Sequence, residues 1–83
     1  MENTTHELKT IEPYYLKVYL GLKNFELRKF DRDYKVGDTL ILKQYNAENK
    51  TYTGQFMTRK ITYILSDATQ FGLMEGYCIL GLN

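Results

Sequence analysis

Residues 21–28 read Gly-Leu-Lys-Asn-Phe-Glu-Leu-Arg, and the hydrophobic period of the chain changes within them. Before Gly21, apolar residues recur at helical spacing after Pro13, a residue that suits the first turn of a helix. Glycine adopts the left-handed conformation that ends many helices at no steric cost, so we expect the helix to end at Gly21. After it, Phe25 and Leu27 alternate with polar residues, as is typical of a strand. These residues therefore predict a junction between a helix and a strand.

On both sides of this junction the chain reads as short strands separated by polar turns. We predict strands over residues 6–11, 24–28, 39–45, 55–65 and 77–82. The fourth is long enough to bend across two sheets. About five strands with one main helix after the first strand predict an α+β fold, a small β-barrel whose open end the helix covers.

Size and charge limit the function. The chain has 83 residues, 43% hydrophobic and 25% charged, and this predicts a single globular domain over residues 1–83. Eleven basic residues against ten acidic ones give a net charge of +1, which excludes histone-like wrapping of nucleic acid. A local basic patch on a neutral body stays open.

Several classes of site and location are excluded by what the sequence lacks. One cysteine, Cys78, and one histidine, His6, can form neither an internal disulfide nor a zinc site with the usual spacing, so we expect no metal and no cofactor. The polar, acidic N-terminal segment does not have the pattern of a signal peptide. Apolar stretches reach only about four residues, far short of a membrane span. We expect a cytoplasmic protein with no membrane partner.

The polar face of the predicted strand at residues 24–28 carries the chemistry. Glu26 and Arg28 are two residues apart and so share a face, which Lys23 enters from the end of the helix. A carboxylate between two cations can hold both in fixed directions, as a receptor for an anion or a base edge requires. On residue types alone, a solvated face with surface ion pairs worth less than about 1 kcal/mol is the simpler interpretation.

The pattern Gly21-x-Lys23-x-x-Glu26-x-Arg28 resembles the signature of the ASCH domain family, a member of the PUA-like superfamily. Further segments match in order, so that the resemblance covers nearly the whole chain: His6-Glu7-Leu8-Lys9, Pro13-Tyr14-Tyr15, residues 25–33, 36–38, 63–65 and 73–77. They resemble in particular an uncharacterised bacterial and phage branch for which RNA binding has been suggested. The chain departs from that branch at Phe30, where asparagine is more common.

This resemblance implies a PUA-like pseudo-barrel that binds RNA or a nucleotide-like ligand in a cleft beside residues 21–28. Lys23 would offer a point charge to phosphate, and Arg28 a planar fork to phosphate or a base edge, with Glu26 orienting it. It also implies that the strand with His6 and Lys9 borders the cleft. Lys9 would then add to the positive patch if that strand pairs beside residues 23–28.

Arg32 is expected near the cleft mouth, within a charged turn. Since the resemblance implies that its strand borders the cleft, His6 could contact the ligand through its imidazole, although a lone histidine is more often a satisfied polar residue.

Two alternatives stay open. Some ASCH-like proteins are amidohydrolases that deacylate modified cytidine with a lysine, a threonine three residues later and a distant glutamate. Lys23 matches that lysine and Glu75 could be the distant acid, but Glu26 replaces the nucleophile, and a carboxylate cannot do the work of an activated hydroxyl. We therefore expect no catalytic residues and a binding module instead of an enzyme. The other alternative is a protein-interaction domain, which predicts an exposed apolar patch.

The aromatic residues suggest both core and stacking positions. We expect Tyr15, Tyr19, Tyr63 and Tyr77 in the core, and Tyr34, Tyr45 and Tyr52 as the better exposed candidates for base stacking. Cys78 reads as a small buried hydrophobic residue.

Overall fold

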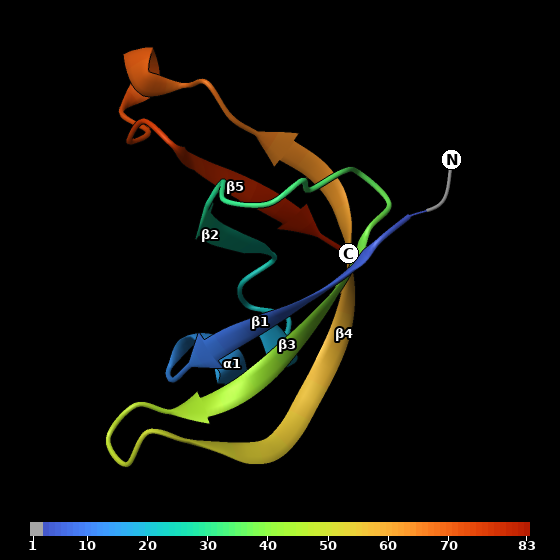
Figure 1. The fold of residues 1–83 in the computed structure, drawn as a ribbon, viewed down its shortest axis with the longest axis vertical. Coiled ribbons are helices and arrows are strands. Elements are labelled where there is room, and N and C mark those ends of the chain that lie inside the picture. Colours follow the sequence, from blue (N-terminus) through green and yellow to red (C-terminus); the bar gives the residue numbers. More distant parts are fainter. Residues whose placement is uncertain (1–2) are drawn as a thin grey trace.

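The computed structural model describes residues 3–83, and the first two residues of the polar N-terminal segment lie outside this range. The elements are β1 (Thr5–Ile11), α1 (Tyr14–Tyr19), β2 (Phe25–Lys29), β3 (Thr39–Asn46), β4 (Thr51–Leu65), the 3-10 helix η1 (Thr69–Phe71) and β5 (Tyr77–Leu82) (Figure 1). The predicted strands and the place of the helix after the first strand are confirmed. Neither helix in the described range is long and apolar enough to cross a membrane.

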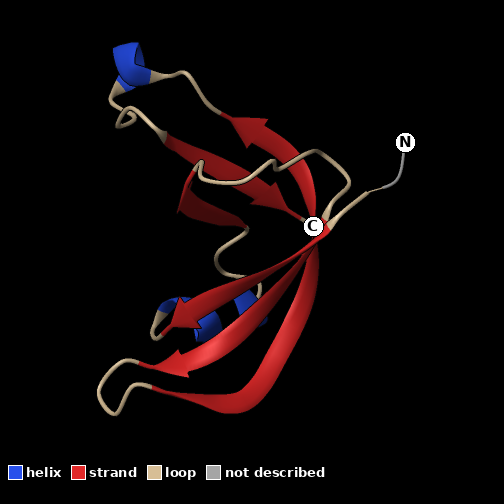
Figure 2. Ribbon diagram, viewed as in Figure 1, coloured by secondary structure: helices blue, strands red, loops and turns tan. Residues whose placement is uncertain are grey.

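The strands form one mixed five-stranded sheet in the order β1-β3-β4-β5-β2. β1 runs parallel to β3, and the other neighbours are antiparallel. β4 pairs with β3 through its first part and with β5 through its last, so it curves through both layers of the bent sheet, as its length predicts (Figure 2). The terminal strands β1 and β2 do not pair with each other, and the sheet is therefore not closed into a barrel by a backbone ladder.

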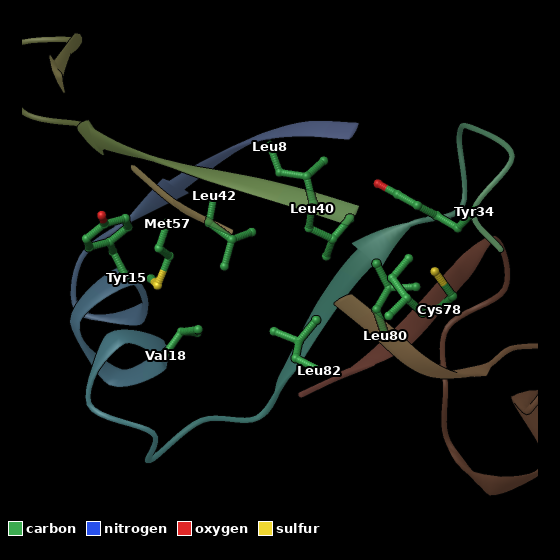
Figure 3. Packing of buried hydrophobic residues seen from close by; sticks show 11 residues of the cluster. Leu8, Tyr15, Val18, Tyr34, Leu40, Leu42, Met57, Cys78, Leu80 and Leu82 are labelled. Carbon is green, nitrogen blue, oxygen red and sulfur yellow. The ribbon is translucent and has the colours of Figure 1, made fainter. Parts of the chain in front are cut away.

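The hydrophobic core lies inside the bend of the sheet. Leucines from both layers meet there, among them Leu40 of β3 and Leu80 of β5, and both are fully buried (Figure 3). Tyr15 and Val18 of α1 point toward Met57 and cover one end of this cluster. The helix therefore closes the end of the core that the sheet leaves open.

The helix buries less of its surface than the sequence predicts. Tyr15 is buried as expected, but its buried companion is Val18, and Tyr19 is 65% exposed. The reason is geometric, because a six-residue helix that touches the sheet with one side buries only positions three residues apart. The core assignment was also wrong for Tyr63, which is exposed on β4, and Tyr34, expected to be exposed, is buried beside His6.

Candidate functional site

The end of α1 fixes the direction in which Lys23 leaves the helix. Gly21 has φ +77°, its N–H donates to the oxygen of Val18 at 3.0 Å, and the N–H of Leu22 donates to the oxygen of Lys17 at 2.9 Å. This pair of bonds is the Schellman motif, and it needs a residue with positive φ at this position. The N–H of Lys23 also donates to the Lys17 oxygen, at 3.1 Å. The predicted helix stop at Gly21 is confirmed.

β2 turns its polar face inward and its apolar face outward. The Glu26 side chain is only 4% exposed, whereas Phe25 is 45% and Leu27 56% exposed. A buried carboxylate is costly unless it is paired and hydrogen bonded, so partners must be present around Glu26. The interpretation of this face as a solvated strand surface is therefore wrong for Glu26.

The partners of Glu26 are the two cations of the signature. Lys23 Nζ donates to Oε2 at 2.7 Å, and Arg28 donates to Oε1 from Nη2 at 2.8 Å and from Nε at 3.1 Å. Lys23 Nζ also donates to the main-chain oxygen of Phe25 at 2.7 Å. Charge-assisted bonds on both carboxylate oxygens fix the lysine on one side and the arginine on the other.

Arg28 also reaches across the gap between the terminal strands. Its Nη2 donates to the main-chain oxygen of Lys9 at 2.8 Å and approaches the hydroxyl of Thr10 at 3.3 Å. Within residues 3–83 these bonds use Nε and Nη2, and Nη1 has no acceptor. One edge of the guanidinium is therefore held by protein, and Nη1 on the other edge has donor capacity that these residues do not use.

A cleft of about 780 Å³ opens over this network, between β1, α1 and β2. Its lining consists of Lys9, Thr10, Ile11, Pro13, Tyr14, Lys17, Leu22, Lys23, Phe25, Glu26, Leu27 and Arg28. Large apolar side chains that are more than a third exposed form its rim: Ile11, Tyr14, Leu22, Phe25 and Leu27. The site thus combines a cationic floor with apolar walls, a combination typical of small-molecule pockets.

Of the predicted site residues, the structure brings together Lys23, Glu26 and Arg28. Lys9 also lines the cleft, but its contact with Arg28 is made by the main-chain oxygen, and its ammonium lies 4.2 Å from the centre of the Tyr45 ring. The Lys9 ammonium was expected to add to the positive patch only if its strand paired beside residues 23–28. This pairing does not occur, because β1 pairs with β3 and not with β2.

His6 and Arg32 do not line the cleft. His6 is buried, and its Nε2 lies 2.8 Å from Oδ2 of Asp38. Arg32 follows β2, and its Nη1 donates to the main-chain oxygen of Glu7 at 3.3 Å. Both residues tie the N-terminal strand to loops further along the chain.

Asp38 is the centre of this second buried cluster. Its carboxylate accepts bonds from the N–H of Thr4 at 2.9 Å and of Lys35 at 3.0 Å in addition to the His6 contact. Burial alone would raise the pKa of Asp38, but the bonds from Thr4, His6 and Lys35 together lower it below its ordinary value of 3.8. Asp38 is thus a buried anchor for β1.

The apolar rim was not predicted from the sequence. One signal for it was present, because large apolar residues are dense from Tyr14 to Leu27, a stretch with one short helix and one five-residue strand. Such small elements cannot bury every large side chain they carry, and the apolar side chains that stay exposed lie around the cleft.

Glu75, the acid considered for a hydrolase, lines a different cavity of about 240 Å³ together with Phe30 and the turn after β4. In residues 3–83 no three histidine, cysteine or acidic side chains are grouped to hold a metal ion.

Two comparisons with known proteins place this chain. An uncharacterised 12.9 kDa protein in the GpA 3' region of Escherichia phage P2 is 37% identical to it over 76 residues. That match covers 90% of this chain and 64% of the phage protein, so the chain spans less than two thirds of its relative. A family model described as a domain of unknown function, DUF3850, matches residues 5–82. The chain belongs to the DUF3850 family.

Proposed function

We propose that this protein is a PUA-like, ASCH-type module that binds RNA or a nucleotide-like ligand in the cleft between β1 and β2. In this proposal the gap between the terminal strands corresponds to the ligand cleft of the pseudo-barrel. Arg28 and Lys23 form its floor, and the apolar rim contacts the ring of the ligand.

The observation that carries the proposal is the guanidinium of Arg28, which is fixed by hydrogen bonds from Nε and Nη2, while Nη1 has no acceptor within residues 3–83. Its Nε and Nη2 are held by Glu26 and by the oxygen of Lys9, so its plane is set before any ligand arrives. A planar fork matches a phosphate or a base edge, and a group fixed in advance loses little entropy on binding. The cleft volume of about 780 Å³ suits a ligand the size of a nucleotide.

The walls support the same ligand class. Phe25 and Tyr14 both lie near Lys23, whose ammonium is 4.9 Å from the centre of the first ring and 5.7 Å from the second. Stacking of a base on an aromatic side chain contributes about 1–3 kcal/mol and tolerates any base. Lys17, also in the lining, adds a further cation for phosphate.

Calorimetric titration with uridine monophosphate and with a short single-stranded RNA tests this function. Arg28→Ala removes the fork and is expected to weaken binding at least about tenfold, the effect of one hydrogen bond to a charged group. Arg28→Lys keeps the charge without the fork and is expected to lose most of that affinity. Lys29→Ala is the matched control, because Lys29 lies on the same strand outside the cleft lining, and it should change affinity less than about twofold.

Equal losses in Arg28→Ala and Lys29→Ala would show that only general charge attracts the ligand, and would contradict the proposal. Each variant is first checked for a native amide spectrum, since Arg28 also neutralises a buried carboxylate.

A further inference from the structure

The main chain of β1 alternates between a neighbour and the cleft. The oxygen of Thr4, next to the strand, accepts from the N–H of Thr39 at the start of β3, so even-numbered residues of β1 face β3. Odd-numbered residues face the other way, and the oxygens of Glu7 and Lys9 accordingly accept from Arg32 and Arg28. The free edge of β1 is therefore the one toward β2.

The same alternation holds for β2. The oxygen of Asn24 accepts from the N–H of Leu82, and the N–H of Phe30 donates to Gly76, so even-numbered residues face β5. Phe25 faces the other side, where its oxygen accepts from Lys23. Leu27, two residues further, presents its N–H and C=O to that same free edge. Lys9, Phe25 and Leu27 all line the cleft, so the two free edges border it together.

Side-chain cations occupy two main-chain acceptors of these edges, but not the C=O of Leu27, which accepts no bond within residues 3–83. The oxygens of Lys9 and Phe25 are bonded by Arg28 and Lys23, whereas the N–H groups of Lys9 and Leu27 have no acceptor within residues 3–83. With Nη1 of Arg28, the cleft therefore offers mainly donors. A ligand that fills it must supply acceptors, because a donor that loses its water without gaining an acceptor weakens binding.

We infer that these free strand edges select the ligand: the cleft takes a planar ring whose edge carries oxo groups, read by the main-chain N–H groups of Leu27 and Lys9. The inference rests on the proposed function and adds to it the group on the ligand that is recognised. Because the hydrogen bonds to the oxo groups come from main-chain N–H groups, the side chain of Leu27 contributes only contact area.

Two ligands and two variants test it. Uridine monophosphate is compared with its 2,4-difluorobenzene isostere, which keeps the ring shape and the phosphate but replaces the oxo groups with fluorine and the ring N–H between them with C–H. Leu27→Pro removes the N–H at the free edge and leaves the bonds to β5, and proline is tolerated on an edge strand in this orientation. Leu27→Ala is the control, since it also removes the side chain but keeps the N–H.

The protein as it stands is expected to bind the uridine ligand at least about fivefold more tightly than the isostere. Leu27→Ala should lower both affinities and keep that ratio, whereas Leu27→Pro should bring the ratio close to one. In the unaltered protein the amide proton resonances of Leu27 and Lys9 should move downfield with the uridine ligand only.

Equal binding of both ligands by the unaltered protein would overturn the inference, whether or not Leu27→Pro folds, and would leave the proposed function standing. An equal ratio in Leu27→Pro and Leu27→Ala would overturn it as well. Failure to bind either ligand or RNA would remove the proposed function and the inference with it.

Discussion

Nη2 of Arg28 donates a 2.8 Å hydrogen bond to the main-chain oxygen of Lys9, and this bond joins the two terminal strands of the sheet. Unpaired strand edges attract other chains, and proteins cover or occupy them in various ways. Here a side chain spans the gap, and the space around it becomes a cleft. The residue that links β1 to β2 therefore also lines the cleft, where the proposed function places the ligand.

Glu26 is expected to stabilise the fold as well as to orient the cations. Glu26→Gln keeps the shape and removes the charge that Lys23 and Arg28 share, which should lower the free energy of unfolding by about 2 kcal/mol. Urea denaturation measures the loss. Glu48→Gln, an exposed position in the hairpin after β3, is the control and should change stability by less than about 0.5 kcal/mol. A loss no larger than that of the control would refute a structural role for the carboxylate.

Gly21 should tolerate asparagine better than alanine. A Cβ at this position meets no atom within 4 Å, so the cost of substitution comes from its φ of +77° alone. Gly21→Ala is expected to destabilise the protein by about 1–2 kcal/mol, and Gly21→Asn by less, because asparagine enters the left-handed region more readily. Thermal unfolding of both variants measures the difference. If Gly21→Ala leaves the thermal stability unchanged, the Schellman motif at the end of α1 does not depend on a glycine with positive φ.

The Asp38 cluster predicts a loss of stability in acid. The pKa of Asp38 is lower in the folded protein than its ordinary value of 3.8, so its contribution is present above that value and is lost as the pH falls through the folded-state pKa. Urea midpoints should therefore fall steeply below about pH 4, and less steeply in Asp38→Asn, which has no carboxylate to protonate. Parallel curves for the two proteins would assign the acid sensitivity to other groups.

Cys78 should resist thiol reagents in the folded protein. It is fully buried in the core, and burial, with a smaller contribution from Asp31, raises the pKa of its thiol above the ordinary value. Labelling with a disulfide reagent should be slow in buffer and should accelerate through the urea unfolding transition. The rate in fully unfolded protein provides the reference, and native labelling near that rate would contradict the burial of this residue.

The fold could be predicted largely because its signals are local. Alternation of polar and apolar residues marks each strand, the length of β4 implies its bend, and Gly21 marks the end of the helix whatever the rest of the chain does. The helix face could not be predicted equally well. Which of its apolar residues are buried depends on where the sheet lies, and the sheet contacts only the side with Tyr15 and Val18.

The residues of the site could be predicted from the sequence, but the long-range contacts that orient their side chains could not. Lys23, Glu26 and Arg28 are near one another in sequence, so their association follows from strand geometry. The bond from Arg28 to Lys9 joins residues nineteen positions apart on strands that do not pair, so no local pattern predicts it. For the same reason the sequence placed His6 beside the cleft, whereas the structure pairs it with Asp38.

Amide NMR titration with uridine monophosphate and short RNA at near-physiological salt tests whether Arg28 organises a ligand cleft. Shifts are expected only in the cleft segments of β1, α1 and β2, absent in Arg28→Ala and retained in Lys29→Ala. Shifts spread over the surface that vanish with added salt, or no shifts at all, would contradict this expectation. The exposed apolar rim would then be better explained as a surface for a protein partner.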